Sequence, residues 1–499
     1  MSASSAAEAR RAARNAGAIA AASVLSKGAL FLWQLALARA LGESVYGVYG
    51  AVGSFIAVGT SLVNFGMGPI VIRDVARRPE QAGKYLTATL VMQSALALLA
   101  YALVNGAAAL GGYPADVRAF LALAAISLLV DILGNMTNDI LLAQERMVAS
   151  SLAAEGHVVL LVALAGAALL AGWGLWGVYA ATIAAGLARS ALLWLLVLRG
   201  GVRPRWPFER AVAVPLLING APLALAAFLS LAYQHADKLM TARFIGPAET
   251  GHLTAAFVVV FGVVELLNTT ILTATYPMMA RYYGDGDRFG LMVGKLAFFT
   301  LAFILPLALI VSLFAAEIAV PLFGPGFAPT ADALRILIWY ALASMIANVF
   351  AQAVMVQNRQ RSLLGIRAAG LTGNIALNAV LIPRLGVAGA ALASLAAESV
   401  VLVVLLLVFH ERGWNPAQTL PRVARAIMAG GLAALAALAL RPLHPLAGIA
   451  GGLAAYGAGV WLLRALGEDD LDLLYRLAAA MPGGALVRRV WKRSTPINW

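Results

Sequence analysis

The chain is a succession of apolar blocks, each about 20 residues long, separated by short polar breaks marked by charged residues, glycine or proline. An α-helix needs about 20 residues to cross the roughly 30 Å hydrocarbon layer of a bilayer. Barrel strands would be shorter and would alternate apolar with polar positions, so the pattern predicts an all-α polytopic membrane protein with about 14 transmembrane helices. The predicted spans lie near residues 16–39, 45–72, 84–106, 117–140, 151–171, 174–198, 212–236, 251–276, 291–315, 331–355, 363–382, 386–409, 422–440 and 444–464.

Composition agrees with insertion in a membrane. Of the 499 residues, 62% are hydrophobic and 12% are charged, and the mean hydropathy is +0.86. Soluble domains carry about 25% charged residues. The absence of cysteine from the sequence excludes disulfides, thiolate metal ligands and cysteine nucleophiles. The first apolar run is longer than the roughly 7–15 residues of a signal-peptide core, so we expect it to be the first membrane anchor.

Lysine and arginine residues set the expected orientation. The formal net charge is +13, and the basic residues concentrate in alternate loops, for example over 73–84 and 199–210. By the positive-inside rule these loops and both termini are cytoplasmic. The longest loops expected outside, near 106–117 and 316–331, leave no room for a folded outer domain. The charge therefore suits anionic lipid rather than nucleic acid, and the tail over 465–499 is predicted to be amphipathic and basic on the cytoplasmic membrane surface.

Short motifs recur along the chain at a nearly constant spacing, which indicates duplication of a six-helix unit. Because six is even, both copies would enter the membrane from the same side as parallel repeats, and transporters with such repeats bind substrate between the halves near the midplane. The offsets drift only from about 204 to 213 residues. The matching pairs are Arg39-Ala-Leu-Gly42 with Arg243-Phe-Ile-Gly246, Pro69-x-x-x-Arg73 with Pro277-x-x-x-Arg281, Gln144-Glu-Arg146 with Gln357-Asn-Arg359, and Gly174-Leu-Trp-Gly177 with Gly386-Val-Ala-Gly389.

The duplication predicts two lobes followed by two extra helices that lie outside the repeat. The segments are a cytoplasmic basic tail (1–15), an N-lobe of helices 1–6 (16–198), a cytoplasmic linker (199–211), a C-lobe of helices 7–12 (212–409), helices 13 and 14 (410–464) and a cytoplasmic tail (465–499).

Polar side chains inside the predicted spans are the candidates for function. An ionisable group at the bilayer centre costs from about 3 to more than 10 kcal/mol, so such groups usually face a protein interior or a watery cavity. Lys27 lies near the centre of the first span, with Ser23 and Gln34 on its helix face. We expect Lys27 to be a cavity cation that binds substrate with these neighbours. A structural ion pair with an acid on another helix is the alternative.

The seventh span carries a second polar face. Asn219, Gln234 and Asp237 fall on one side of the predicted helix and end beside Lys238. We expect Asn219, Gln234 and Lys238 to line the cavity. Asp237 and Lys238 lie near the expected outer end, where an interfacial charge pair is the alternative.

Three further carboxylates lie within spans. Glu265 is central in the eighth span, Asp131 is deep in the fourth span, and Glu398 stands among small residues in the twelfth. With Asp237 they are candidates for ion coupling or for charge pairing, and helix packing is an equal alternative for Glu398. Arg189 lies off-centre in its span, and reaching an interface or a neighbouring carbonyl is its favoured interpretation.

Sequence motifs of catalytic type are scarce. The five histidines are scattered, paired metal-ligand spacing does not occur, and the sequence has no phosphate-binding loop. A membrane polymerase or ligase acting on lipid-linked sugars would also be expected to hold charged groups in a sizeable outer loop. The sequence therefore predicts a protein that is not an enzyme and holds no metal.

The beginning of the chain and the predicted duplication together resemble a known family of transporters. The residues that carry the resemblance are Asn15, Ser23, Lys27, Leu37-Ala-Arg-Ala-Leu-Gly42, Tyr46-Gly-Val-Tyr49 and Gly66-Met-Gly-Pro69 with Arg73. They are similar to oligosaccharide (O-antigen or exopolysaccharide) flippases of the multidrug/oligosaccharidyl-lipid/polysaccharide exporter superfamily.

The resemblance implies a transporter that flips an undecaprenyl-pyrophosphate-linked oligosaccharide from the inner to the outer leaflet of the bacterial plasma membrane. It implies alternating access of two lobes around a cationic cavity, a lipid-tail groove beside the last two helices, and a role in surface polysaccharide biosynthesis. The implied partners are the lipid-linked oligosaccharide, membrane lipids and the polysaccharide polymerase machinery. A cofactor is not implied, and coupling to a proton or sodium gradient stays open.

Lys27 connects the residues to this function, because a fixed cation lowers the electrostatic cost of moving a diphosphate through a site of reduced dielectric. Two other transporters stay open as alternatives. One is a cation-coupled multidrug or small-molecule antiporter of the same superfamily, which twelve spans would suit better than fourteen. The other is a lipid II flippase, for which cavity cations are sparse in this sequence. A scaffold without transport is hard to reconcile with so many polar residues inside spans.

Overall fold

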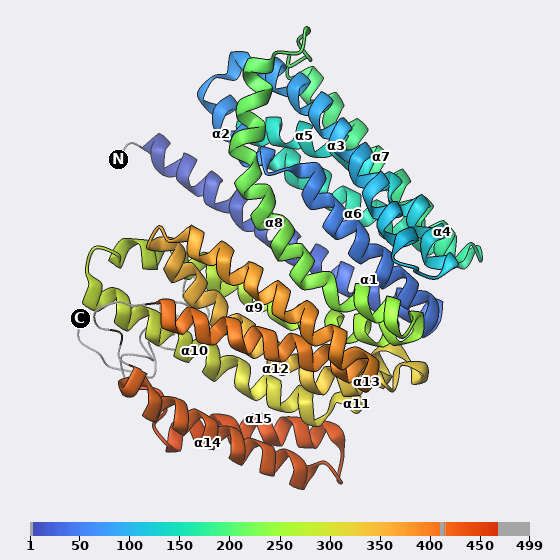
Figure 1. Ribbon diagram of the computed structural model, residues 1–499. Helices are drawn as coiled ribbons and strands as arrows, with labels where there is room; N and C mark the ends of the chain where they lie inside the picture. The colour runs from blue at the N-terminus through green and yellow to red at the C-terminus, as the bar shows by residue number, and fades with distance from the viewer. Residues whose placement is uncertain (1–2, 410–413, 415, 468–499) are drawn as a thin grey trace. The chain divides into compact units, whose positions relative to one another are not determined.

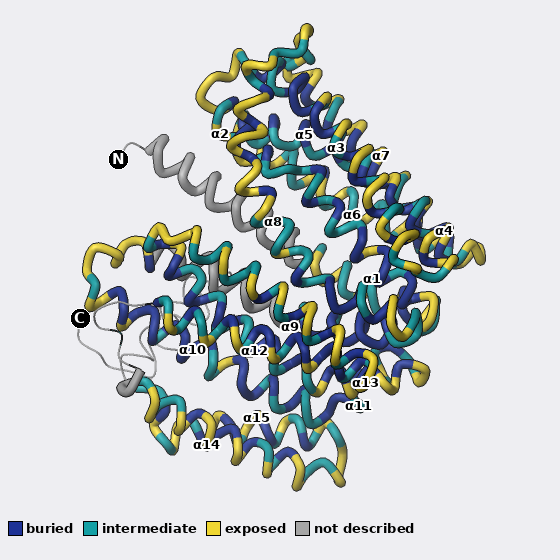
Figure 2. Tube along the Cα trace, in the orientation of Figure 1, coloured by how far each residue is buried: buried dark blue, intermediate teal, exposed yellow. Residues whose placement is uncertain are grey.

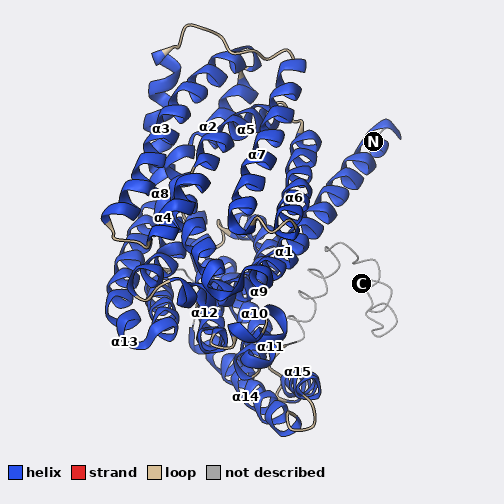
Figure 3. Ribbon diagram, turned by 90° about the vertical axis from the view of Figure 1, so that its right-hand side faces the viewer, coloured by secondary structure: helices blue, strands red, loops and turns tan. Residues whose placement is uncertain are grey.

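Helices make up every regular element in the described part of the computed structural model (Figures 1 and 3). The structure describes residues 3–409, 414 and 416–467, with side chains described outside 3–25, 263–278 and 416–418. The chain divides into two compact units by internal contact. The first comprises residues 1–254 with 378–387, and the second comprises 255–377 with 388–499.

The first unit holds the helices of the first half of the chain and α8. It also includes the first turns of α9 and a short stretch of α13. Its helices are α1 (Ala3–Asn64), α2 (Met67–Arg77), α3 (Ala82–Leu110), α4 (Ala115–Ala124), α5 (Ile126–Ala143), α6 (Met147–Leu170), α7 (Gly174–Arg199) and α8 (Arg210–Phe244), with a 3₁₀ turn over Pro79–Gln81.

The second unit holds the remaining helices. Contact thus groups α8 with the preceding helices, although the repeat assigns it to the second lobe; the lobe boundaries stay a prediction. The helices are α9 (Pro247–Tyr282), α10 (Gly286–Leu313), α11 (Ala315–Phe323), α12 (Thr330–Val356), α13 (Gln360–Val408), α14 (Pro416–Leu440) and α15 (Pro445–Leu462), with a 3₁₀ turn over Pro325–Phe327.

The helices confirm the predicted all-α membrane fold. Among the described residues, 11 segments are long and apolar enough to cross a membrane. Two of them, Ser26–Arg77 and Gln360–Val408, contain 52 and 49 residues, enough for two crossings each. Helix α9, of 36 residues, coincides with the predicted eighth span. Together these segments correspond to the fourteen predicted spans.

Two details of the helices differ from the prediction. The predicted fourth span is built from two helices, α4 and α5, that meet at Ala125. The segment over 316–331, expected to be a loop, contains the short helix α11. Hydrophobic periodicity marks where a span lies but does not locate such local breaks.

Glycine breaks the two longest helical segments. Gly42 within α1 has φ 72° and ψ 169°, and Gly386 within α13 has φ 59° and ψ −138°. These conformations are accessible essentially to glycine alone, because a Cβ atom would clash with the backbone. Each glycine therefore ends one span and begins the next within a single helical segment.

Matching backbone geometry in the two halves agrees with the predicted duplication. Glu145 and Asn358, at corresponding places in the repeated motifs, both have positive φ, 60° and 57°. Gly174 and Gly386, which begin the next matching span, have φ of 54° and 59°. The repeated residues therefore form the same kinds of turn in both halves.

An arginine after each of these turns makes the same hydrogen bond in both halves. Arg146 Nη1 donates to the carbonyl of Leu196 near the end of α7 at 3.0 Å, and Arg359 Nη1 donates to the carbonyl of Val408 at the end of α13 at 2.9 Å. A helix leaves its last carbonyls without intrahelical donors, and a cation there also interacts favourably with the helix dipole. This equivalence is a second feature that the duplication explains.

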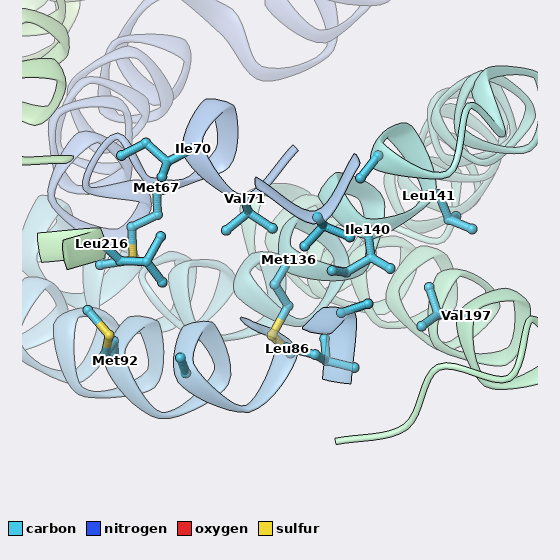
Figure 4. Close-up of a cluster of buried hydrophobic side chains, with 14 of the residues drawn as sticks. Met67, Ile70, Val71, Leu86, Met92, Met136, Ile140, Leu141, Val197 and Leu216 are labelled. Carbon is cyan, nitrogen blue, oxygen red and sulfur yellow. The ribbon is translucent and has the colours of Figure 1, made fainter. Parts of the chain in front are cut away.

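The helices bury one face and expose another (Figure 2). A cluster of buried apolar side chains in the first unit joins α2, α3, α5, α6, α7 and α8 (Figure 4). Lipid tails are as apolar as these side chains, so inside the membrane their close packing and van der Waals contact, rather than transfer from water, stabilise the bundle. The labelled members are Met67, Ile70, Val71, Leu86, Met92, Met136, Ile140, Leu141, Val197 and Leu216.

The two helices outside the repeat, α14 and α15, pair through small residues. A Cβ atom added to Gly459 would lie 3.0 Å from the Cβ atom of Ala429. Small residues of this kind let membrane helices approach closely. Beyond the end of α14, Arg441 Nε donates to Glu317 Oε1 of α11 at 2.8 Å, which connects this hairpin to the rest of the second unit.

We predict that Gly386→Ala lowers the thermal stability of the purified protein, because alanine at this backbone conformation costs about 1–3 kcal/mol. Gly373→Ala is the matched control: Gly373 lies within the helical part of α13, and an added Cβ meets nothing within 4 Å. Alanine is favoured there by up to about 1 kcal/mol. Thermal unfolding in detergent, followed by circular dichroism, measures both variants. Equal melting temperatures would contradict the role of Gly386.

Candidate functional site

Lys27 lies on the first arm of α1, about four helical turns before the break at Gly42. Its side chain is exposed, as is the neighbouring position Gly28, so the helices of the first unit do not cover this face. Ser23, predicted to share the face, lies among the residues whose side chains are not described. An exposed ammonium within a span is the kind of group that a membrane protein retains for a polar partner.

Gln34, also predicted to line the cavity, contacts tyrosines of the second arm of α1. Tyr46 donates its hydroxyl to Gln34 Oε1 at 3.1 Å, and Gln34 Nε2 donates to the hydroxyl of Tyr49 at 3.2 Å. The rings of Tyr46 and Tyr49 are stacked at 5.8 Å, and that of Tyr49 stacks on Tyr179 of α7 at 6.2 Å. These contacts give Gln34 a structural role across the break in α1, and its cavity role stays a prediction.

The polar residues predicted on the seventh span divide between exposed and buried environments on α8. Asn219 is exposed, and Gln234 is half-buried with its Nε2 donating to Ser230 Oγ at 3.4 Å. Asp237 and Lys238 are only 3% and 8% exposed. Both charges are buried, and the cavity role and the interfacial charge pair both stay predictions.

Asp237 is held by a hydrogen bond from a distant part of the chain. Asn378 Nδ2 of α13 donates to Asp237 Oδ1 at 2.5 Å. A bond to an ionised carboxylate is stronger than one between neutral groups, and it lowers the cost of burying the charge. The sequence places these residues 141 positions apart, so their contact could not be predicted from helix periodicity.

Asp131 belongs to a polar group between α5 and α7 that contains Arg189. Both Nη1 and Nη2 of Arg189 donate to Asn135 Oδ1, at 3.2 and 3.3 Å. Asp131 and Asp139 lie four residues before and after Asn135, on the same face of α5. The arginine is therefore bound midway along a row of two carboxylates and one amide.

Arg189 is the residue whose importance the sequence underestimated. Its off-centre position suggested a side chain reaching an interface, whereas it is half-buried and binds a side chain on a neighbouring helix. The available signal was the spacing of Asp131, Asn135 and Asp139 on one helix face. The partner of that face could be found only from the packing of α5 against α7.

The other two predicted carboxylates lie apart from these groups. Glu398 of α13, in the second unit, is fully buried at 0% exposure. Glu265 lies on α9 among the residues whose side chains are not described, so its predicted ion-coupling role falls outside the described side chains. Within the described residues that were searched, no group of three or more His, Cys, Asp or Glu side chains could hold a metal ion.

The multiple apolar spans and the polar side chains within them define a polytopic membrane protein. Residues 36–332 match the family model of the polysaccharide biosynthesis proteins, and the protein belongs to this family. The match covers more than half of the chain and confirms the resemblance found at its beginning. A search of curated proteins found no match.

Solved structures agree on the fold. The lipid II flippase MurJ in an inward closed conformation matches with a TM-score of 0.76 at 13% identity, over 89% of this chain and 98% of its own. An inward-facing multidrug resistance transporter of the MATE family, in the MOP superfamily, matches with a TM-score of 0.61 at 14% identity, over 76% and 93%. The chain therefore has the fold of this superfamily of flippases and transporters.

We predict that Asn378→Leu destabilises the protein by about 1.5–3 kcal/mol, because the buried Asp237 carboxylate loses a charge-assisted donor. Thr372→Val, on the same helix, is the control, since the exposed Thr372 hydroxyl donates only to a carbonyl of its own helix. Thermal unfolding followed by tryptophan fluorescence measures the difference. Equal stability of the two variants would contradict a supporting role for Asn378.

Proposed function

We propose that the protein flips an undecaprenyl-pyrophosphate-linked oligosaccharide from the inner to the outer leaflet of the bacterial plasma membrane, for surface polysaccharide biosynthesis. The observation that carries the proposal is the family match over 36–332, which connects the chain to polysaccharide biosynthesis. The shared fold with a lipid II flippase supports movement of a lipid-linked substrate. Transport proceeds by alternating access, without chemical change to the substrate, so the protein is not an enzyme.

Lys27 is proposed to bind the pyrophosphate of the substrate. A diphosphate that leaves water loses its hydration, and a fixed ammonium in a site of reduced dielectric compensates part of that loss. Lysine acts as a point charge with three donors, so it can follow a phosphate group that moves between leaflets. The Lys27 side chain is exposed, which makes it accessible to a phosphate group.

The orientation follows from the distribution of basic residues. We propose that both termini are cytoplasmic and that the loop Gly111–Pro114 and the junction near Gly246 face outward. The proposed partners are the lipid-linked oligosaccharide, membrane lipids and the polysaccharide polymerase machinery.

Two groups of carboxylates support coupling to a cation gradient. Asp237 is a buried acid on α8. Asp131 and Asp139, both on α5, lie on either side of Asn135, which binds Arg189 of α7. Two carboxylates beside a single guanidinium carry one excess negative charge when both are ionised, which a proton or sodium ion can neutralise. We propose that one of these groups binds the coupling ion.

Two alternative functions are compared with this proposal. Coverage of 98% of MurJ favours a lipid II flippase as the second candidate. The multidrug antiporter is less favoured, since the antiporter matches 76% of this chain, and α14 and α15 extend the chain beyond twelve spans.

We predict that Lys27→Ala lowers the rate of flipping by about 10- to 100-fold, because a charge-assisted contact contributes about 1.5–3 kcal/mol. Lys27→Arg should retain part of the activity. Surface polysaccharide, and lipid-linked oligosaccharide accumulating in the cytoplasmic leaflet, are measured at matched protein levels. Leu32→Ala, a change at a 64% exposed apolar position on the same helix arm, should leave both unchanged. Full activity of the alanine variant at position 27 would contradict the assignment.

We predict that flipping in reconstituted vesicles responds to an imposed proton or sodium gradient. Asp131→Asn or Asp237→Asn should remove this response while downhill flipping of a fluorescent lipid-linked oligosaccharide continues. The wild-type protein without a gradient provides the baseline. Identical wild-type rates with and without both gradients would exclude coupling.

A further inference from the structure

Two helix arms, the part of α1 after Gly42 and the first turns of α9 after Gly246, approach each other backbone to backbone. A Cβ atom added to Gly47 would lie 1.7 Å from the carbonyl oxygen of Pro247. One added to Gly251 would lie 1.9 Å from the carbonyl oxygen of Glu43. Any side chain at either glycine would push the two helices apart, so this crossing depends on both glycines.

The crossing joins each residue to its own counterpart in the repeat. Gly47 meets Gly251, and a Cβ atom on Gly50 would lie 2.1 Å from Thr254 Oγ1. The residue numbers in both pairs differ by 204, the same offset that separates the repeated Arg39 and Arg243 motifs. The duplication therefore places two equivalent helix starts against each other, related by a local pseudo-two-fold axis.

Both helix starts follow a glycine with positive φ. Gly42 has φ 72° and Gly246 has φ 121°, and each lies five residues before the glycine of the crossing. Backbone at such positions absorbs changes in φ and ψ with little steric cost, as hinges of moving elements do. The two arms thus touch through backbone at Gly47 and Gly251 and through the Thr254 side chain at Gly50, and each follows a glycine that can act as a hinge.

Polar contacts between α8 and the loop after α3 lie at the same end of the first unit. Tyr113 donates its hydroxyl to the carbonyl of Leu239 at 3.1 Å, and Arg243 Nε donates to the carbonyl of Gly111. Burial raises the pKa of Tyr113, while the nearby Arg243 lowers it to a smaller extent, so the hydroxyl stays protonated and a donor at neutral pH. These contacts hold the outer end of α8 with modest energy.

A third contact connects α8 to the crossing itself. His235 Nδ1 lies 3.1 Å from Ser54 Oγ, and Ser54 donates its hydroxyl to the carbonyl of Gly50 at 2.8 Å. Because the serine proton is directed to Gly50, the His235 Nδ1–H is assigned as the donor to Ser54. Movement of α8 is therefore coupled to the helix arm that carries Gly50.

We propose that the Gly47–Gly251 crossing is the outer gate of the transporter, closed in this structure and opened by rotation of the two arms about Gly42 and Gly246. The proposal rests on the transport function and orientation proposed above. Alternating access requires a seal at the outer side that excludes water and ions in one state and separates in the other. Close backbone contact at Gly47 and Gly251, with the Thr254 side chain against Gly50, gives such a seal, and the few polar contacts around it can be exchanged for water when it opens.

A reversible cross-link tests whether the crossing must open. The natural chain has no cysteine, so the double variant Gly50→Cys/Thr254→Cys has no background thiols. The Cβ atom built at Gly50 lies 3.1 Å from Thr254 Cβ, slightly closer than the roughly 3.5–4.5 Å of a disulfide. A protease site in the 199–211 linker makes the cross-link visible, because the two fragments stay joined without reductant.

The expected result is that mild oxidation joins the fragments and abolishes flipping, and that reductant restores it in the same sample. The two single-cysteine variants should be insensitive to both reagents. Failure to form the cross-link, or undiminished flipping by the cross-linked protein, would overturn the gate.

Labelling from outside tests the gate without any substrate. Gly47→Ala should raise the rate at which Thr254→Cys reacts with a membrane-impermeant maleimide by at least about tenfold, since the added methyl separates the arms. Gly53→Ala on the same helix is the control, because a Cβ there meets nothing within 4 Å. Equal labelling of the two backgrounds would contradict the gate. Absence of flipping by the wild-type protein would instead refute the proposed substrate, while labelling still decides the gate.

Discussion

A chain inside hydrocarbon must satisfy its backbone hydrogen bonds internally, and the rest of this structure depends on that constraint. It makes every span a helix and restricts breaks to places where other groups complete the hydrogen bonding. Arg146 and Arg359 show how such an end is supported, since each donates to a carbonyl in the last turn of a helical segment, at Leu196 of α7 and Val408 of α13. Gly42 and Gly386 show the complementary solution, in which glycine lets one helical segment change direction with no long loop.

The same constraint sorts the polar side chains of the spans. Asp237 is buried with a donor from Asn378, and Arg189 binds Asn135 with carboxylates on either side, so both are held within the first unit. Lys27 differs because its side chain is exposed. A charge that the protein encloses can stabilise or couple, whereas the exposed Lys27 is the cation that we propose binds the negative charge of the substrate.

The predicted duplication accounts for two kinds of equivalence in the structure. One is repeated local geometry, seen in the matching positive φ angles of Glu145 and Asn358. The other is direct contact between equivalent residues, as at Gly47 and Gly251. The first follows from similar sequences folding alike; the second requires the copies to meet. The small residues Gly47 and Gly251 lie where close packing of the two copies and the proposed opening of the gate coincide.

The sequence by itself determined the spans, their helical character and the family membership suggested by its first 80 residues, and it predicted the repeat, because these depend on periodicity and local motifs. It did not determine that Gln34 would bind Tyr46 and Tyr49, or that Arg189 would lie against Asn135. Buried and lipid-facing positions of a membrane helix are equally apolar, so the sequence carries little information on which faces meet. Only the tertiary structure decided those contacts, since they depend on the rotation of each helix against its neighbours.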